Sequence, residues 1–296
     1  MRFFYGRDKR RDYFEGWYLK QQNQRETVAL IPAFHADGAG RASASLQVIT
    51  GARSYKIDFP AESFHADGKK SFIRLGGSTF SEQGCSLDVR APDCTMRGRL
   101  RFSGLTPPAG DIMGPFRFVP FLECRHSVFS LRHCVNGELN INGKPYRFEN
   151  GSGYLEGDRG RSFPRRYLWT QCNWDGNSLM LSAAEIPYAG TSFTGCTGFL
   201  FLNGKEYRIA TYCGAKLLSV GNDGISLRQK TLTLNIRLLE GHGSSLYAPQ
   251  SGRMARTVRE SISCRVHYSC LAEQGTLFDF ISEQASFEDN WMERPN

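Results

Sequence analysis

Two carboxylic acids lie two positions apart just past the middle of the chain, in the segment Gly153-Tyr-Leu-Glu-Gly-Asp-Arg-Gly160. On a β-strand, side chains at alternate positions point the same way, so Glu156 and Asp158 would share one face. Two carboxylates in a partly apolar pocket cannot both ionise easily, and one is driven toward its protonated form. This arrangement supplies a proton donor at neutral pH. The alternative is that both acids form solvated ion pairs with the four arginines between Arg159 and Arg166.

A second polar group is Glu123-Cys-Arg-His126. On a strand, Cys124 and His126 would face one side, and Glu123 the other. The spacing of these residues and of the nearby His133-Cys134 pair matches no zinc signature, so we predict no metal ion. Two readings of His126 stay open. It either takes part in a site between two domains or is a buried histidine bonded to a backbone carbonyl.

The residues around these groups predict an all-β protein. Runs such as Leu232-Thr-Leu-Asn-Ile-Arg-Leu238 alternate apolar and polar residues, as half-buried antiparallel strands do. Strands spaced by roughly ten residues are typical of a sandwich or a barrel. Asn-Gly and Asp-Gly steps, which favour hairpin turns, begin at Asp37, Asp67, Asn136, Asn142, Asn150, Asp175, Asn203 and Asp223.

Weak internal similarity predicts two copies of one β-rich unit. Tyr13-Phe-Glu-Gly16 is similar to Tyr154-Leu-Glu-Gly157, Trp17–Asn23 to Trp169–Asn173, and Val28–Pro32 to Ala183–Pro187. A Pro- and Gly-rich connector, residues 104–115, marks a junction. We therefore expect an N-terminal barrel over residues 1–115, a junction with closing strands over 116–152, and a C-terminal barrel over 153–296.

The composition narrows the partners and the location. The net charge is +8, but the basic residues are dispersed rather than gathered in a stripe, so we expect no nucleic-acid partner. Peripheral contact with an anionic membrane stays open. No stretch resembles a membrane span or a signal peptide, and nine cysteines without CxxC pairs favour reduced thiols. We predict a cytoplasmic location, and the sequence leaves the oligomeric state open.

Several ordered blocks resemble the tocopherol cyclase family, including its bacterial members. They are Tyr13–Lys20, Asp111–Gly114, Pro120–Val128, Gly153–Glu156, Gly160–Pro164, Tyr167–Asn173, Ala210–Tyr212 and Gly252–Ser261. The resemblance covers nearly the whole chain. It implies two lipocalin-like antiparallel β-barrels in tandem. It also implies protonation of a prenyl double bond, followed by capture of the tertiary cation by a phenolic oxygen, without a redox cofactor.

The resemblance and this chemistry together suggest roles for individual residues. Asp158 or Glu156 would be the acid, and His126 with Glu123 would accept the phenolic proton. Gln171 and Asn173 would hydrogen-bond the ring oxygens. The other residues expected to bind the substrate are Trp17, Tyr18, Trp169, Tyr212 and Arg159.

One departure separates this chain from the family. After Glu156 the family reads Lys-Asp-Trp-Gly, whereas this chain reads Gly157-Asp-Arg-Gly160. Arg159 would then lie beside Asp158 and stabilise its carboxylate. A non-catalytic carrier of an apolar isoprenoid or lipid is therefore the alternative to a cyclase. An interaction protein with filled barrels is a third reading.

Overall fold

The computed structural model describes residues 3–67, 71–119, 122–188, 190–221, 224–241 and 243–291. Gly68, Pro120, Phe121 and Asp223, which belong to motifs named above, lie outside these residues. The described residues form antiparallel strands and four short 3₁₀ helices, which confirms the all-β prediction. These helices are η1 (Gly6–Asp8), η2 (Ala61–Ser63), η3 (Gly114–Phe118) and η4 (Thr211–Cys213).

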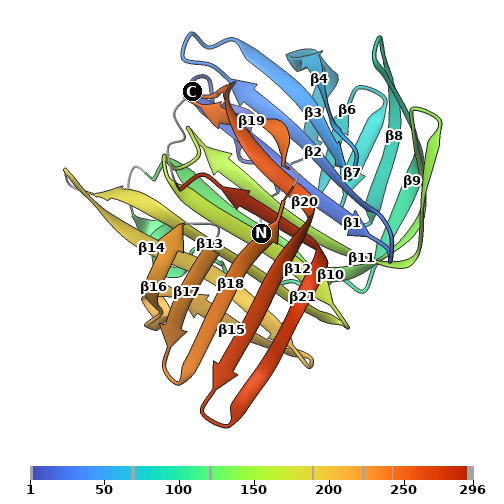
Figure 1. The fold of residues 1–296 in the computed structure, drawn as a ribbon. Coiled ribbons are helices and arrows are strands. Elements are labelled where there is room, and N and C mark those ends of the chain that lie inside the picture. The colour runs from blue at the N-terminus through green and yellow to red at the C-terminus, as the bar shows by residue number, and fades with distance from the viewer. Residues whose placement is uncertain are drawn as a thin grey trace. The chain divides into compact units, whose positions relative to one another are not determined.

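The first sheet has eleven strands in the order β4-β3-β2-β1-β11-β10-β9-β8-β7-β6-β5 (Figure 1). No pairing joins β4 to β5 in the part of the chain that the structure describes. The strands are β1 (Tyr13–Gln22), β2 (Thr27–Ala36), β3 (Ala42–Thr50), β4 (Ser54–Pro60), β5 (Phe64–Asp67), β6 (Phe72–Leu75), β7 (Ser78–Ser81), β8 (Gly84–Ala91), β9 (Cys94–Ser103), β10 (Cys124–Ile141) and β11 (Lys144–Gly160).

The second sheet has the order β15-β14-β13-β12-β21-β20-β18-β17-β16, and β19 pairs with β20. Its strands are β12 (Tyr167–Trp174), β13 (Asn177–Tyr188), β14 (Thr191–Leu202), β15 (Lys205–Ala210), β16 (Lys216–Gly221), β17 (Gly224–Gln229), β18 (Leu232–Glu240), β19 (Ser244–Gln250), β20 (Arg253–Ala272) and β21 (Gly275–Asp289).

The two strand orders correspond to each other. A meander of four strands, β1 to β4 or β12 to β15, lies beside a long antiparallel pair, β11-β10 or β21-β20. The similarity of Trp17–Asn23 to Trp169–Asn173 therefore matches β1 with β12. The similarity of Tyr13–Gly16 to Tyr154–Gly157 does not relate the two sheets. Both segments lie in the first sheet, on the neighbouring strands β1 and β11.

Contacts divide the chain into two compact units. The first takes in residues 1–108, 123–163 and 247–256, and the second takes in 109–122, 164–246 and 257–296. A boundary at residue 153 would fall inside β11, which pairs with β1 over Ser152–Gly160 and with β10 from Lys144 to Gly160.

Each sheet packs apolar residues on one face. β9 alternates strictly, with Met96, Leu100 and Phe102 buried and the arginines between them exposed. β1 differs, because nine of its ten residues are buried. Trp17 and Leu19 belong to the apolar core of the first unit, whereas Lys20 on the other face is fully buried. The central strands thus have a second buried face, which is polar.

Three of the Asn-Gly and Asp-Gly steps form two-residue hairpins with positive φ at both positions, at Asn142, Asp175 and Asn203. Asn136 and Asn150 instead lie inside β10 and β11. A register shift between Val135 and Gly137 accommodates Asn136 within β10. The turn signal is therefore correct only where the strands end.

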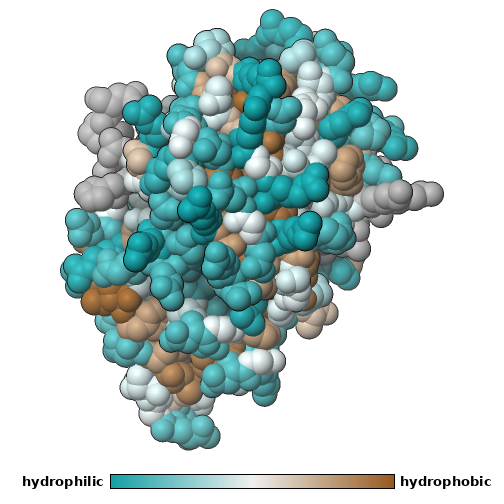
Figure 2. Space-filling view, turned by 90° about the vertical axis from the view of Figure 1, so that its right-hand side faces the viewer, coloured by the Kyte–Doolittle hydropathy of each residue, from teal (hydrophilic) through white to brown (hydrophobic). Residues whose placement is uncertain are grey.

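The molecular surface agrees with the composition. On the face drawn in Figure 2, hydrophilic residues predominate and hydrophobic ones form small separate groups. Among the described residues, no helix is long and apolar enough to cross a membrane.

Candidate active site

Three neighbouring strands of the first unit position a group of ionisable side chains. The register aligns His126 of β10 with Asp158 of β11, and it aligns both Val128 of β10 and Tyr18 of β1 with Glu156. Because side chains alternate along a strand, Tyr154, Glu156 and Asp158 project from one face of β11. This is the polar face, opposite to the one that packs against the core.

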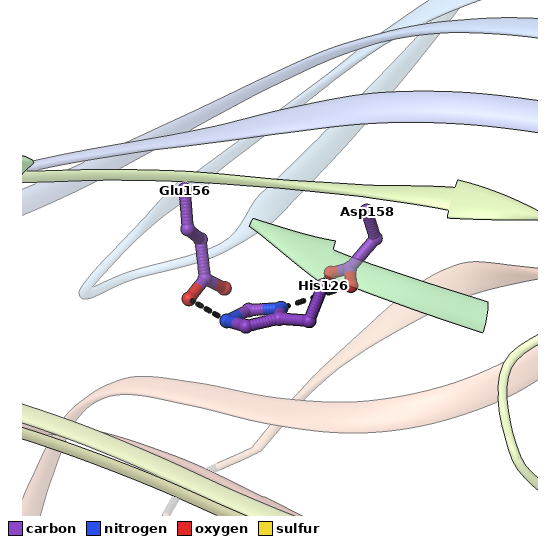
Figure 3. A group of neighbouring side chains, drawn as sticks. All are labelled: His126, Glu156 and Asp158. Atoms are coloured by element: carbon purple, nitrogen blue, oxygen red, sulfur yellow. Dashed lines mark hydrogen bonds and ion pairs between the residues drawn. The ribbon is translucent and has the colours of Figure 1, made fainter. Parts of the chain in front are cut away.

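The imidazole of His126 lies between the two carboxylates (Figure 3). Its Nδ1 is 2.9 Å from Asp158 Oδ1, in hydrogen-bond geometry. Its Nε2 is 3.1 Å from Glu156 Oε2, an ion-pair distance at an angle too bent for a good hydrogen bond. The side chains of His126, Glu156 and Asp158 are only 12, 6 and 21% exposed, so water screens these charges weakly.

Burial and charge act against each other at His126. Burial disfavours the imidazolium, but the charges of Asp158 and Glu156 outweigh this effect and hold the pKa of His126 well above its usual range. Burial raises the pKa of Glu156, while the nearby imidazolium lowers it. The site therefore has a protonated imidazole next to a carboxyl group that burial holds closer to its neutral form.

Two further side chains complete the group. The Tyr154 hydroxyl donates to Glu156 Oε2 over 2.5 Å, and the Cys124 thiol lies 3.5 Å from Asp158 Oδ1. Burial raises the pKa of Cys124, so the thiol stays protonated. The sequence analysis missed Tyr154. The alternation Tyr154-x-Glu156-x-Asp158 on a strand was the signal that could have revealed it.

Glu123 and Arg159 lie away from His126. Glu123 accepts a hydrogen bond from Arg161 over 2.8 Å, as a partly exposed ion pair. The Arg159 guanidinium donates to Ser127 Oγ and lies 4.0 Å from the centre of the Tyr5 ring. Since Arg159 alternates with Asp158 along β11, it projects from the other face. The expectation that Arg159 pairs with Asp158 was therefore wrong.

The residues expected to bind the substrate fall into three groups. Tyr18 lies on the face of the site, with its Cα aligned with that of Glu156. Trp17 lies on the opposite face, in the apolar core, where its ring is 5.5 Å from that of Phe3 and 6.2 Å from that of Phe64. Trp169, Gln171 and Asn173 are buried residues of β12, in the second unit. There, the Gln171 amide donates to Asn173 Oδ1 over 2.9 Å.

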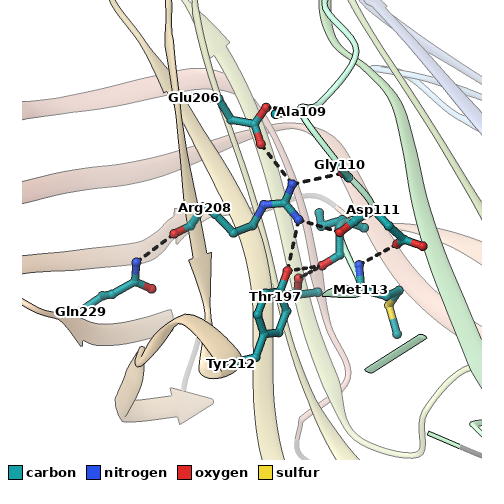
Figure 4. Close-up of polar contacts among 10 residues, drawn as sticks. Ala109, Gly110, Asp111, Met113, Thr197, Glu206, Arg208, Tyr212 and Gln229 are labelled. Carbon is teal, nitrogen blue, oxygen red and sulfur yellow. Dashed lines mark hydrogen bonds and ion pairs between the residues drawn. The ribbon is translucent and has the colours of Figure 1, made fainter. Parts of the chain in front are cut away.

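Tyr212 also belongs to the second unit, where it fixes the segment 109–114 (Figure 4). Its hydroxyl donates to the Ile112 carbonyl over 2.6 Å and accepts from Arg208 over 3.1 Å. The Arg208 guanidinium also donates to the carbonyls of Gly110 and Asp111. Gly114 has a φ of +50°, and a Cβ there would lie 2.5 Å from the Tyr212 ring. These contacts are those of a structural anchor for the Asp111–Gly114 block.

His126, Glu156 and Asp158 are also close enough to be considered as metal ligands. The two carboxylates, however, approach opposite nitrogens of the same imidazole ring. A cation on one nitrogen would have only one carboxylate beside it and would break that ion pair. The arrangement fits a chain that holds and passes protons better than it fits a metal site.

No protein-family profile and no curated protein matches the sequence. Solved structures do resemble the fold. A protein described as an AttH of Nitrosomonas europaea has a TM-score of 0.53 at 11% identity, over 95% of this chain and 93% of that one. Kievitone hydratase from Nectria haematococca has a TM-score of 0.54 at 9% identity, over 94% and 88%. These TM-scores show a common fold over almost the whole chain, and at such low identities they show the fold alone.

Proposed function

We propose that the protein is a cofactor-free, tocopherol cyclase-like isomerase that protonates an alkene of a prenylated quinol, with Glu156 as the acid. The observation that carries the proposal is the His126 imidazole between two largely buried carboxylates. We include in the proposal that the two sheets form lipocalin-like barrels, that the substrate is the hydrophobic partner, and that the protein is cytoplasmic. The free state of all nine cysteines supports the last point.

The surroundings of Glu156 support its role as the acid. Burial favours the neutral carboxyl group, which can then donate a proton. Its Oε2 already accepts from Tyr154 and faces His126 Nε2, so the transferable proton belongs on Oε1. After transfer, the Glu156 carboxylate is stabilised by the imidazolium and by the Tyr154 hydroxyl. Stabilising the conjugate base in this way strengthens the acid.

The reaction is balanced without another reactant. The π electrons of the alkene form a C–H bond with the Glu156 proton and leave a tertiary cation on the neighbouring carbon. A lone pair of the phenolic oxygen then forms the C–O bond of the chromanol ring. The phenolic proton returns to the Glu156 carboxylate, which restores the acid. Asp158 keeps the imidazole oriented and charged throughout.

Water is the competing nucleophile for the same cation. Its capture would give a tertiary alcohol, and the name of the hydratase that shares this fold describes an addition of water. The assay should therefore measure both products. The active site must exclude water from the cation for cyclisation to prevail.

The test incubates the wild-type protein, Glu156→Gln, Asp158→Asn and Glu123→Gln with a panel of prenylated quinols in D₂O. We expect a chromanol with one deuterium at the former alkene carbon, lost in Glu156→Gln and retained in Glu123→Gln, whose partner is Arg161. Deuterated tertiary alcohol as the main product would make the protein a hydratase. A prenyl lipid that co-purifies unchanged with all four proteins, without turnover, would favour the carrier.

A further inference from the structure

A second polar site lies inside the first unit, on the core face of the strands that carry the candidate active site. Gln21 of β1, Gly153 of β11 and His133 of β10 are aligned across three neighbouring strands. Gln21 shares the face of Trp17 and Leu19. The His133 ring lies 4.5 Å from that of Phe102, which belongs to the same apolar core.

Gly153 makes room for this site. A Cβ on Gly153 would lie 2.1 Å from His133 Nε2, so the imidazole occupies the space that a side chain would take. Gln21 is fully buried and His133 is 2% exposed. Among the described residues, neither the Gln21 amide nor His133 Nε2 has a hydrogen-bond partner. Unsatisfied groups at this depth destabilise the fold unless a ligand pairs with them.

The hydrogen bonds around His133 define its tautomer. Ser130 donates its hydroxyl proton to the Arg132 carbonyl over 2.7 Å, so Ser130 Oγ acts as an acceptor toward His133 Nδ1, 3.2 Å away. Nδ1 therefore carries the proton, and Nε2 is a bare acceptor. Burial lowers the pKa of His133 to about 4, which keeps the ring neutral at physiological pH.

The apolar surroundings continue from this site toward the N-terminus. Trp17 is four residues from Gln21 on β1, a distance of about 13 Å at the usual rise of a strand. There, Phe3 contacts Trp17 and Phe129, and Phe4 contacts Trp17 and Phe64, although neither phenylalanine belongs to the sheet. Residues 5–12 link them to β1. The Tyr5 amide donates to Glu15 Oε2 and Gly6 is buried, whereas residues 7–12 are exposed. Two apolar rings that contact the core without belonging to a strand can be exchanged for an apolar tail that buries a similar area.

We infer that the interior of the first unit binds an apolar alcohol, whose hydroxyl donates to His133 Nε2 and accepts from the Gln21 amide. The tail of this ligand takes the place of the Phe3 and Phe4 rings. A hydroxyl group satisfies both partners, whereas an aldehyde has no proton for Nε2 and a hydrocarbon satisfies neither. The alcohol is a ligand of an interior site and is independent of the reaction at Glu156.

The first experiment measures displacement of the apolar dye N-phenyl-1-naphthylamine by farnesol, farnesal and farnesene. Farnesol should displace the dye at a concentration about tenfold lower than farnesal, because the aldehyde leaves Nε2 unpaired. The double variant Phe3→Ala/Phe4→Ala should bind farnesol more tightly than the wild type does, since the competing rings are gone. Equal displacement by the alcohol and the hydrocarbon in both proteins would overturn the inference.

The second experiment removes the polar groups. Gln21→Leu and His133→Leu should lose the preference for farnesol while unfolding at no lower temperature, because an unsatisfied group is replaced by an apolar one. Glu156→Gln should keep the preference, which separates this site from the proposed function. If Gln21→Leu retains the preference, or if it is stabilised while no protein tested binds farnesol, the inference fails and Gln21 and His133 hold only water.

Discussion

At the scale of the residue, the chemistry depends on one histidine and the charges on either side of it. His126 Nδ1 and Nε2 lie 2.9 and 3.1 Å from Asp158 and Glu156, so the charge of each carboxylate acts directly on the imidazole. The identities of these residues were visible in the sequence, but the partner assigned to His126 was Glu123. In the structure, Glu123 forms an ion pair with Arg161 instead.

Asp158→Asn should lower the pKa of His126, because it removes one of the two charges that oppose the cost of burial. NMR titration of the imidazole ring measures this shift, and Glu123→Gln should leave it unchanged. The raised pKa also predicts that the ion pairs of His126 stabilise the fold below about pH 6.5 and that this contribution is lost as the pH rises through the folded-state value. An unchanged pKa in Asp158→Asn would contradict the charge balance described here.

Glu15 should make stability fall as the pH rises. Burial raises its pKa from 4.5 to about 7, although hydrogen bonds from Tyr13 and Tyr5 and the charge of Arg159 favour the carboxylate. The folded state therefore binds more protons than the unfolded state between these values, a difference of about 3 kcal/mol. Urea unfolding near pH 4.5 and near pH 8 should show Glu15→Gln gaining stability relative to the wild type by this order. A pH-independent difference would rule out this titration.

At the scale of the element, β11 holds both sites because it is central to its sheet and because residues 153–157 are buried on both faces. Its polar face carries Tyr154, Glu156 and Asp158, and its core face carries Gly153 and Gly157. Glycine is needed where neighbours leave no room. A Cβ on Gly157 would lie 3.0 Å from the Gly16 carbonyl and from the Phe129 ring.

Gly153→Ala should destabilise the protein by about 1–3 kcal/mol, because its methyl group would overlap the His133 ring and force it out of place. Gly51→Ala is the control, since no atom lies within 4 Å of the added carbon. Chemical unfolding of both variants measures the difference. Equal stabilities would mean that the His133 ring moves aside freely.

At the scale of the whole molecule, the chain folds into two compact units, and each unit is built from several separate segments of the chain. Residues 247–256 complete the first unit. Within it, Gln47 exchanges two hydrogen bonds with the backbone of Tyr247, and Arg253 pairs with Asp37. The division expected from the sequence instead places residues 247–256 in the C-terminal barrel, 153–296.

A chain divided after residue 152 should yield fragments without a cooperative unfolding transition, because the cut severs β11 and separates residues 247–256 from the first unit. Near-UV circular dichroism and thermal unfolding of each fragment test this. A chain cut at the exposed turn between Pro92 and Asp93 should stay assembled and serve as the control. A folded fragment 1–152 would support the tandem division.

The sequence by itself determined the all-β class and the shared face of Glu156 and Asp158. It also paired Trp17–Asn23 with Trp169–Asn173, the segments that occupy β1 and β12. These three predictions depend on the alternation of side chains, on turn-forming residues and on local sequence similarity, which are properties of residues close together in the chain. Only the tertiary structure decided that His126 lies between the two acids, that Arg159 faces away, and that Gln21 and His133 share a buried site. Each of these depends on the register of β1, β11 and β10, which pairs residues far apart in the sequence and which no local pattern encodes.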